Sequence, residues 1–503
     1  MTIDPDAHLR IGMPFDAQCF NEAWKYFTGH GGYYVANNIY SRLVVLDVFE
    51  TGDIHPDLAE RWEILDGGRR YRFYLNPAAT WHDGVAVTAH DVAYTYREVI
   101  EHGYQAIAFL RELEEVRVLD DYTVECILDG PNAAFLAQLG SFVLTHIVPK
   151  HLYHGTDWST NPHNWRPVGS GPFKFVEHIR SDRDGRVELV ANENYWREGP
   201  YISRLTYHVI PDKADAHAAL FRGDIHHAKH DVSASEIEAW QGREGVALRV
   251  DAGHSLGVLA FNWRQERFQD RRVRESIARV IDRREVRDAL HHGLETPKAY
   301  YLDHVDWAYN PDALAPDMDR AAAERLLDEA GFMRDANGIR MRLRMATRQL
   351  YPHYGVAARV FKAQFATVGI ELSVEDLDPT GWQRRVAEAH DFDLAIDAGD
   401  IGPDPHQLAS TTATNGARNI MGYSNPVVDE CFRLGRTSID RAQRGPHYKK
   451  LQAELAKDIA RVPFLRYGEY LPYRTEFEGF SWSDGVRGTI PVWSMGKVRK
   501  ARR

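Results

Sequence analysis

A glycine-terminated helical segment that leads directly into a strand is the feature that most constrains the fold. Apolar residues recur on one helical face through residues 357–368, Gly369 follows, and apolar residues then alternate as in a β-strand through residues 370–374. A second helix is predicted over residues 321–330, directly before Gly331. Because helix and strand alternate in this way through residues 270–400, the sequence predicts an α/β domain there.

The first part of the chain favours strands before helices. Residues 43–46 form a short apolar run and residues 71–75 alternate between polar and apolar, so the region from 41 to about 80 is predicted to be β-rich. Thr88 and Asp91 have the spacing of a capping box at the start of a helix. Asp270 is the predicted N-cap of another helix. We find no internal repeat, low-complexity tract or long linker in the sequence.

Composition and charge exclude several classes of protein. The chain has 503 residues, 44% hydrophobic and 26% charged, which is the balance of a folded protein, and its length suits about two to four domains. Its 61 Lys and Arg against 72 Asp and Glu give a net charge of −11, which argues against a nucleic-acid partner. No stretch reaches the roughly 18 consecutive apolar residues that a membrane-spanning helix needs. The first six residues lack the features of a secretory signal peptide, so the protein is either cytoplasmic or its signal has been removed.

Metal-binding patterns are weak in this sequence. Cys19, Cys126 and Cys431 are isolated from one another and match no zinc spacing. Histidines come close together at residues 226–230 and 291–292. The first group follows a turn-like segment and starts a short strand, where neighbouring side chains point to opposite faces. We therefore expect no metal site and no cofactor.

One catalytic pattern is present around Ser255. Residues 253–257 match the G-x-S-x-G nucleophile elbow and follow an alternating stretch. An elbow must run into a helix, but residues 258–262 continue as apolar, strand-like sequence. A serine in a turn or at a strand end is therefore favoured, and a hydrolase that uses Ser255 is kept as an alternative.

An acidic loop and a set of aromatic residues are better candidates for ligand contacts. In residues 391–405 a strand-like core runs into a Gly/Pro-rich segment that carries several carboxylates, and a loop at a strand end is a common ligand position. The N-terminal segment is rich in aromatic residues that include Phe20 and Tyr33. Most of these rings must be core, but several can line a cleft.

Short motifs follow one another along the chain in a characteristic order. The most specific block comprises PDLAERWE at 56–63, YRFYL at 71–75, WHDG at 81–84 and TAHDV at 88–92. Further motifs are PVGSGPF at 167–173, NENYW at 192–196, FN at 261–262, VR at 273–274, IDR at 281–283, LLDEAG at 326–331, VGI at 368–370 and GYSNP at 422–426 with Asp429. This ordered set resembles the solute-binding proteins of ABC importers, specifically the peptide/nickel/oligopeptide-binding family (family 5, cluster C), over nearly the whole chain.

The resemblance implies an α/β fold of the periplasmic-binding-protein type II, with two α/β lobes, a hinge and an extra inserted β-rich domain. The implied division is lobe I at residues 1–40, 169–258 and 477–503, the inserted domain at 41–168, and lobe II at 259–476. Such a protein is not an enzyme. It is expected to capture a small solute (a peptide, an opine or an oligosaccharide-like molecule) in the cleft between the lobes by hinge closure.

The family's late loop often reads W-x-x-D-x-x-D-P, and the first of its acids meets the ligand's α-amino group in peptide-binding relatives. Here Gly399-Asp400 and Asp404-Pro405 match, while a smaller residue near Ala398 stands at the tryptophan position. The resemblance therefore implies that Asp400 and Gly399 contact the ligand, and we expect Asp404 to shape the loop. The other expected ligand contacts are Asn262, Trp382, Arg348, Tyr33 and Phe20.

The expected partners are a small-molecule ligand and the permease subunits of an ABC transporter, with no nucleic acid. We expect a monomer that is periplasmic, or extracellular and membrane-associated, with its signal peptide removed. A cytoplasmic regulator with the same cleft remains a further alternative, beside the hydrolase.

Overall fold

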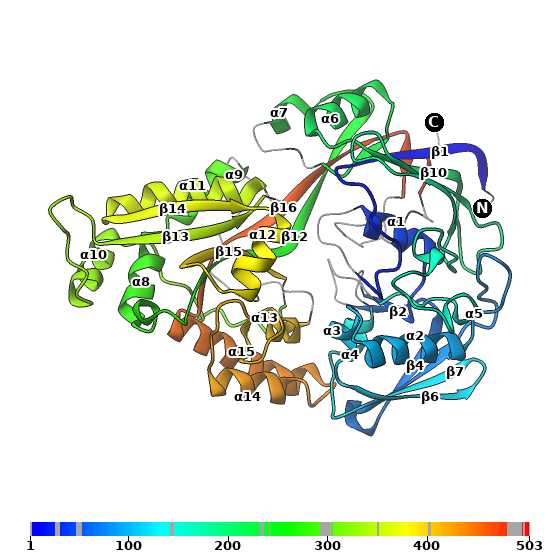
Figure 1. Ribbon diagram of the computed structural model, residues 1–503, viewed down its shortest axis with the longest axis horizontal. Helices are drawn as coiled ribbons and strands as arrows, with labels where there is room; N and C mark the ends of the chain where they lie inside the picture. Colours follow the sequence, from blue (N-terminus) through cyan, green and yellow to red (C-terminus); the bar gives the residue numbers. More distant parts are fainter. Residues whose placement is uncertain are drawn as a thin grey trace. The chain divides into compact units, whose positions relative to one another are not determined.

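The computed structural model divides the chain into two compact units (Figure 1). It describes residues 3–25, 31–46, 53–140, 145–230, 232, 236–240, 242–291, 302, 305–349, 352–400, 404–479, 495 and 498–501. Unit 1 comprises Met1–Val232, Glu236–Asp251 and Glu469–Arg503, and unit 2 comprises Ser233–Ser235 and Ala252–Gly468. Two long strands, β12 (Val246–Phe261) and β16 (Arg461–Arg474), pass from one unit to the other. The predicted inserted domain at 41–168 and the first segment of lobe I at 1–40 both fall within unit 1, so the two units do not separate them. The division into three domains therefore stays a prediction.

Unit 1 contains two main sheets with helices packed around them. In the larger sheet the order is β11-β1-β10-β9-β8, with β1 parallel to both β10 and β11, and in the smaller antiparallel sheet it is β4-β5-β7-β6. The strands are β1 (Asp4–Met13), β2 (Val44–Leu46), β3 (Ile54–Pro56), β4 (Ala59–Leu65), β5 (Arg70–Leu75), β6 (Leu113–Asp120), β7 (Thr123–Leu128), β8 (Phe173–Ile179), β9 (Arg186–Ala191), β10 (Ile202–Val209), β11 (His227–Ala228), β17 (Phe477–Glu478) and β18 (Arg499–Lys500). The helices are α1 (Gly32–Ile39), α2 (Ala89–His102), α3 (Ile107–Leu110), α4 (Phe135–Leu139), α5 (Lys150–Tyr153), α6 (Lys213–Arg222) and α7 (Ile237–Trp240).

The sequence patterns of the β-rich region are confirmed. Strand β5 alternates between half-buried and buried residues along its whole length. Helix α2 begins at the predicted capping box, in which the backbone N–H of Thr88 donates to Asp91 Oδ2 at 2.8 Å. The helix ends at Gly103, whose φ of +64° is in the left-handed region that glycine adopts at little cost.

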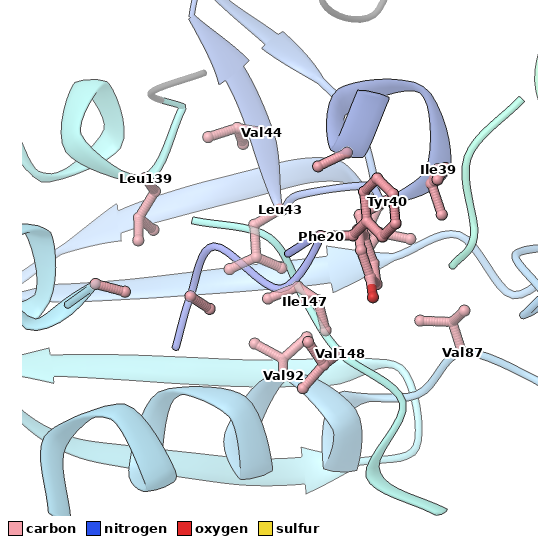
Figure 2. Packing of buried hydrophobic residues seen from close by; sticks show 14 of the residues in the cluster. Phe20, Ile39, Tyr40, Leu43, Val44, Val87, Val92, Leu139, Ile147 and Val148 are labelled. Carbon is pink, nitrogen blue, oxygen red and sulfur yellow. The ribbon is translucent and has the colours of Figure 1, made fainter. Parts of the chain in front are cut away.

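One continuous hydrophobic core runs through unit 1. Figure 2 shows Phe20 and Tyr40 packed with Leu43, Val92 and Ile147, which come from both the predicted lobe I and the predicted inserted domain. This shared core explains why the two predicted domains form a single compact unit. Phe20 has no exposed surface and its ring contacts Phe175, at a centroid distance of 5.7 Å. We therefore correct its predicted role, because a fully buried core side chain is not available to a ligand.

Unit 2 is built on a sheet in the order β14-β13-β15-β12. Strands β13 (Met341–Arg348), β14 (Ile370–Leu377) and β15 (Leu394–Asp400) run parallel, and β12 is antiparallel to β15. The helices are α8 (Arg271–Val280), α9 (Arg283–His291), α10 (Arg320–Glu329), α11 (Pro352–Thr367), α12 (Pro379–Trp382), α13 (Ala409–Thr412), α14 (Pro426–Gly435) and α15 (Arg441–Asp458). Short 3₁₀ turns lie at Asp66–Gly68, Pro162–Asn164, Glu266–Phe268 and Pro405–Leu408, and a π-helical turn at Gln383–Glu388.

Both faces of this sheet are covered. Leu394 and Ile396 of β15 pack in a cluster with Phe361 of α11, whereas Ala395 packs in a second cluster with Trp382 and with residues of α14 and α15. The predicted succession of helix, glycine and strand is confirmed at Gly369, whose φ is +81° and where a Cβ would lie 2.7 Å from the carbonyl oxygen of Gly338. Asp270 caps α8 as predicted, because its side chain accepts from the backbone N–H of Arg272. No helix among the described residues is long and apolar enough to cross a membrane.

Candidate ligand-binding site

Three parallel strands of unit 2 end at the same edge of the sheet. Arg348 at the end of β13 is in register with Leu377 at the end of β14, and β15 continues three residues past the level of Arg348, to Asp400. In open α/β sheets ligands bind outside the carboxyl ends of the strands. We refer to this edge as the strand-end site.

Arg348, Asp397 and Trp382 lie together at the strand-end site. Arg348 Nη2 donates to Asp397 Oδ1 at 2.9 Å, and the guanidinium carbon lies 4.1 Å from the centroid of the Trp382 ring. All three side chains are largely buried, with Asp397 8% and Arg348 18% exposed. The arrangement is a charge-assisted hydrogen bond beside a cation–π contact.

The backbone of Asp400 and Gly399 pairs with β12. Asp400 lies opposite Ser255, and Gly399 lies opposite Leu256. The side chain of Asp400 is outside the described part of the structure, so its contact with a ligand stays a prediction. The predicted position at the end of a strand is confirmed.

Ser255 lies inside a strand. Strand β12 continues without interruption from Val246 to Phe261, so the residues after Ser255 remain extended and pair with β15. A nucleophile elbow requires a sharp turn from a strand into a helix, which holds the serine exposed. Ser255 therefore lacks the backbone geometry of a nucleophile elbow, and the G-x-S-x-G match does not support a hydrolase.

Asp404 caps the turn Pro405–Leu408 and ties it to α15. Its two carboxylate oxygens accept from Arg444 of α15 at 2.8 Å each, and Oδ1 also accepts from the backbone N–H of His406 at 2.9 Å. Burial raises the pKa of this carboxyl, but Arg444 and the two kinds of hydrogen bond outweigh burial and hold the pKa below its usual value. Asp404 is therefore a structural carboxylate of the loop.

Asn262 is at the opposite end of β15 from Asp400, and Tyr33 belongs to unit 1. Asn262 is beside Asp393, just before the start of β15. Seven extended residues separate Asp393 from Asp400, which is a distance of about 20 Å. Its side-chain amide donates to the backbone carbonyls of His390 and Phe392, both at 2.9 Å. This role accounts for its burial, and we remove Asn262 from the proposed site. Tyr33 belongs to α1 of unit 1, where its ring lies 4.0 Å from that of Tyr34.

Sequence reasoning missed Asp397 as a site residue. It was one carboxylate among several in residues 391–405, and nothing in the local pattern distinguishes it. The missing information is the register between β13 and β15, in which Met345 is opposite Leu394, so that three residues later Arg348 comes level with Asp397. A correct parallel pairing of the two strands is the signal that would have found it.

Two of the histidines singled out in the sequence, His226 and His227, have local partners. His226 accepts from the backbone N–H of Arg10 at 2.9 Å, and Nδ1 of His227 lies 3.0 Å from the carbonyl of Pro472. Burial, and then Arg10, lower the pKa of His226 to about 3. The described residues contain no group of three side chains that could hold a metal ion, and His292 lies outside them.

The most specific sequence motifs serve the fold of unit 1. His82 of the WHDG motif accepts from Gly169 N at 3.2 Å and donates to Gly171 O at 3.0 Å, so it ties this motif to the PVGSGPF segment. Burial lowers the pKa of His82 to about 4, although the bond to Gly171 opposes the shift. These motifs therefore identify the architecture rather than the ligand.

Comparison with known proteins agrees with this architecture. Residues 53–419 match the family model described as bacterial extracellular solute-binding proteins, family 5 Middle. The oligopeptide-binding protein AppA of Bacillus subtilis is 26% identical over 94% of this chain and 89% of its own length. Among solved structures, the ABC transporter-associated periplasmic binding protein DppA of Helicobacter pylori, in complex with the peptide STSA, has a TM-score of 0.84 at 22% identity and covers 98% of each chain.

A further structure shows the same fold with another ligand. AgaA from A. tumefaciens R10, in complex with agropinic acid, has a TM-score of 0.83 at 21% identity and covers 99% of both chains. These likenesses confirm the α/β fold of periplasmic binding proteins that the sequence predicts. Because the family model spans more than half of the 503 residues, this chain belongs to family 5 of the bacterial extracellular solute-binding proteins.

Proposed function

We propose that this protein captures a peptide-like solute outside the cytoplasm and delivers it to the permease of an ABC importer. The observation that supports this ligand class is the strand-end site, where Asp400 ends β15 three residues beyond Asp397, which belongs to the buried group of Arg348, Asp397 and Trp382. In this proposal the Asp400 carboxylate pairs with an ammonium group of the ligand, and Gly399 allows close approach of the ligand to the backbone. The guanidinium of Arg348, which stacks on the Trp382 ring, also lines the proposed site.

The relatives support a peptide as the first choice of ligand. AppA of B. subtilis is named as an oligopeptide-binding protein, and H. pylori DppA was solved with a peptide. The AgaA complex, which contains agropinic acid, supports keeping opine-like solutes as the second choice. An oligosaccharide-like ligand has no such support and is not proposed.

A hydrolase is not favoured as the function. Ser255 lies within β12, and the family that the chain belongs to is described as solute-binding. Binding followed by hinge closure needs no covalent step, because the energy of the ligand contacts stabilises the closed state. The family description and the relatives' names also support an extracytoplasmic location and an importer as partner.

Native mass spectrometry of the purified protein tests the proposal. The protein would be incubated with a pool of randomised di- to pentapeptides and, separately, with agropinic acid. We expect one peptide per protein chain to remain bound. Retention of agropinic acid alone would replace peptide by opine as the ligand class, and retention of neither ligand would contradict the proposed function.

A further inference from the structure

The pairing of Arg348 with Asp397 is a consequence of strand register. On β15, Ala395 packs on the sheet face that also buries Trp382, and Asp397, two residues later, lies on the same face. On β13, Ala346 and Arg348 have the same relationship. The two charged residues therefore meet side by side on neighbouring strands, where the Arg348 guanidinium stacks on the Trp382 ring.

Burial makes this ion pair strong enough to matter for ligand choice. Arg348 and Asp397 are only 18% and 8% exposed, so solvent screens their attraction much less than it screens a surface pair. Arg348 Nε, which is itself buried, has no hydrogen-bond partner among the described residues, so Asp397 is the carboxylate that compensates this guanidinium. An anionic ligand group that approached Arg348 would have to compete with Asp397.

The other charges at the three strand ends are mostly acidic. We count the charged residues among the last four positions of β13, β14 and β15 and the position after each strand. They are one arginine, Arg348, and the carboxylates of Glu375, Asp376, Asp378, Asp397 and Asp400. Glu375 pairs with Arg385 at 2.8 Å, and Asp376 accepts from Thr347 at 2.7 Å. With Arg348 paired to Asp397, the balance of charge at the strand-end site is negative.

We propose that Asp397 is a specificity-determining residue of the strand-end site: by pairing with Arg348 it withdraws the guanidinium from anionic ligand groups. The site then accepts the cationic part of a peptide-like solute and shows little preference for a free carboxylate. Asp397 acts as a positioning residue, because its effect on the ligand passes through Arg348. This inference rests on the proposed function and adds to it a statement about ligand charge.

The test compares peptides that differ only in one charge. Two pools of di- to pentapeptides with the same sequences, one with free carboxyl termini and one with carboxyl-terminal amides, would be bound to the wild type and to Asp397→Asn and read by native mass spectrometry. For the wild type we expect the free-acid pool and the amide pool to bind in amounts that differ by no more than about three-fold. For Asp397→Asn, which keeps the side-chain shape and frees Arg348, we expect the ratio of free-acid to amide binding to rise about ten-fold or more, in line with a charge-assisted hydrogen bond.

Matched variants separate specificity from stability. Asp393→Asn removes an equally buried carboxylate, also 8% exposed, at the opposite end of β15, and should keep the wild-type ratio. Adding Arg348→Gln to Asp397→Asn should return the ratio to the wild-type value. If Asp397→Asn does not fold, Arg348→Gln alone provides the test. Because Arg348 is already paired in the wild type, this variant should keep the wild-type ratio of free-acid to amide binding.

Three results would overturn the inference. The first is a wild type that already prefers free acids ten-fold, and the second is a folded Asp397→Asn with the wild-type ratio. The third is a selective loss of free-acid binding in Arg348→Gln. Binding of neither pool by the wild type would instead contradict the proposed function, and the inference with it.

Discussion

Asp404 and Arg444 form a buried two-point contact, in which each carboxylate oxygen accepts from a different guanidinium nitrogen at 2.8 Å. Asp404 follows the predicted ligand-contacting Asp400 by four residues, and Arg444 belongs to α15. The pair ties the turn Pro405–Leu408 to α15, because Asp404 also accepts from the backbone N–H of His406. Two acids close together in the sequence therefore have different roles.

Asp404→Asn should destabilise unit 2. The substitution leaves Arg444 buried without its counter-charge, and breaking a buried pair in this way typically costs about 3–5 kcal/mol of unfolding free energy. Urea unfolding of the variant and of Asp317→Asn, an exposed acid of the same unit, provides the comparison. The control should stay within about 0.5 kcal/mol of the wild type. An equally small change for Asp404→Asn would show that the pair does not stabilise the fold.

His82 should contribute to a loss of stability in acid. The folded protein holds the pKa of His82 at about 4, below its ordinary value of 6.5, because of burial. The folded state thus binds this proton less readily than the unfolded state. Neutral His82 therefore makes its full contribution to the unfolding free energy above pH 6.5, and that contribution is lost as the pH falls towards 4. Its size is at most about 3 kcal/mol for a shift of this magnitude.

The variant His82→Gln isolates that contribution. Glutamine can still donate and accept hydrogen bonds but does not titrate, so its unfolding free energy should fall less than that of the wild type between pH 7.5 and pH 4.5. Urea unfolding at the two pH values measures the difference. Parallel losses in the two proteins would show that His82 does not contribute to the pH dependence.

Much of this fold could be predicted from local sequence patterns. The capping box at Thr88, the N-cap at Asp270 and the left-handed Gly369 each mark an element boundary through chemistry that acts within a few residues, and all three are confirmed. The family motifs predicted the architecture because residues such as His82 hold distant segments together.

The contents of the site could not be predicted as well. Whether Phe20 lines a pocket or fills a core depends on what packs against it. Asn262 follows β12 and lies beside the start of β15, whereas Asp400 ends β15, and the pairing of these two strands decides both positions. The Arg348–Asp397 pair depends on the register of two strands that are 49 positions apart in sequence. Such contacts follow from tertiary pairing, which a single sequence does not display.

Ser255→Ala should leave ligand affinity within a few fold of the wild type. Ser255 is an interior residue of β12, and alanine preserves the backbone pairing with Asp400. We also expect no hydrolysis of ester or amide substrates by the wild type. Turnover that the substitution abolishes would revive the hydrolase. Calorimetry and a chromogenic ester assay on the same preparations measure both properties.

Ligand should reduce the radius of gyration of the protein. The resemblance predicts hinge closure, and the chain passes between the two units within the strands β12 and β16. Small-angle scattering would compare the ligand-free protein with the protein saturated by the peptide that native mass spectrometry identifies. Superimposable curves at saturation would rule out a closing motion.

The contact between Asp400 and the ligand is the central claim, and calorimetric titration of Asp400→Asn tests it most directly. The titrant is the peptide retained by the wild type, and melting curves confirm that the variant is folded. Loss of one partner of a buried charge-assisted bond typically costs about 2–5 kcal/mol, so we predict affinity about 30-fold to several thousand-fold weaker than that of the wild type. A folded Asp400→Asn that binds the peptide as tightly as the wild type would contradict the assignment of the strand-end site.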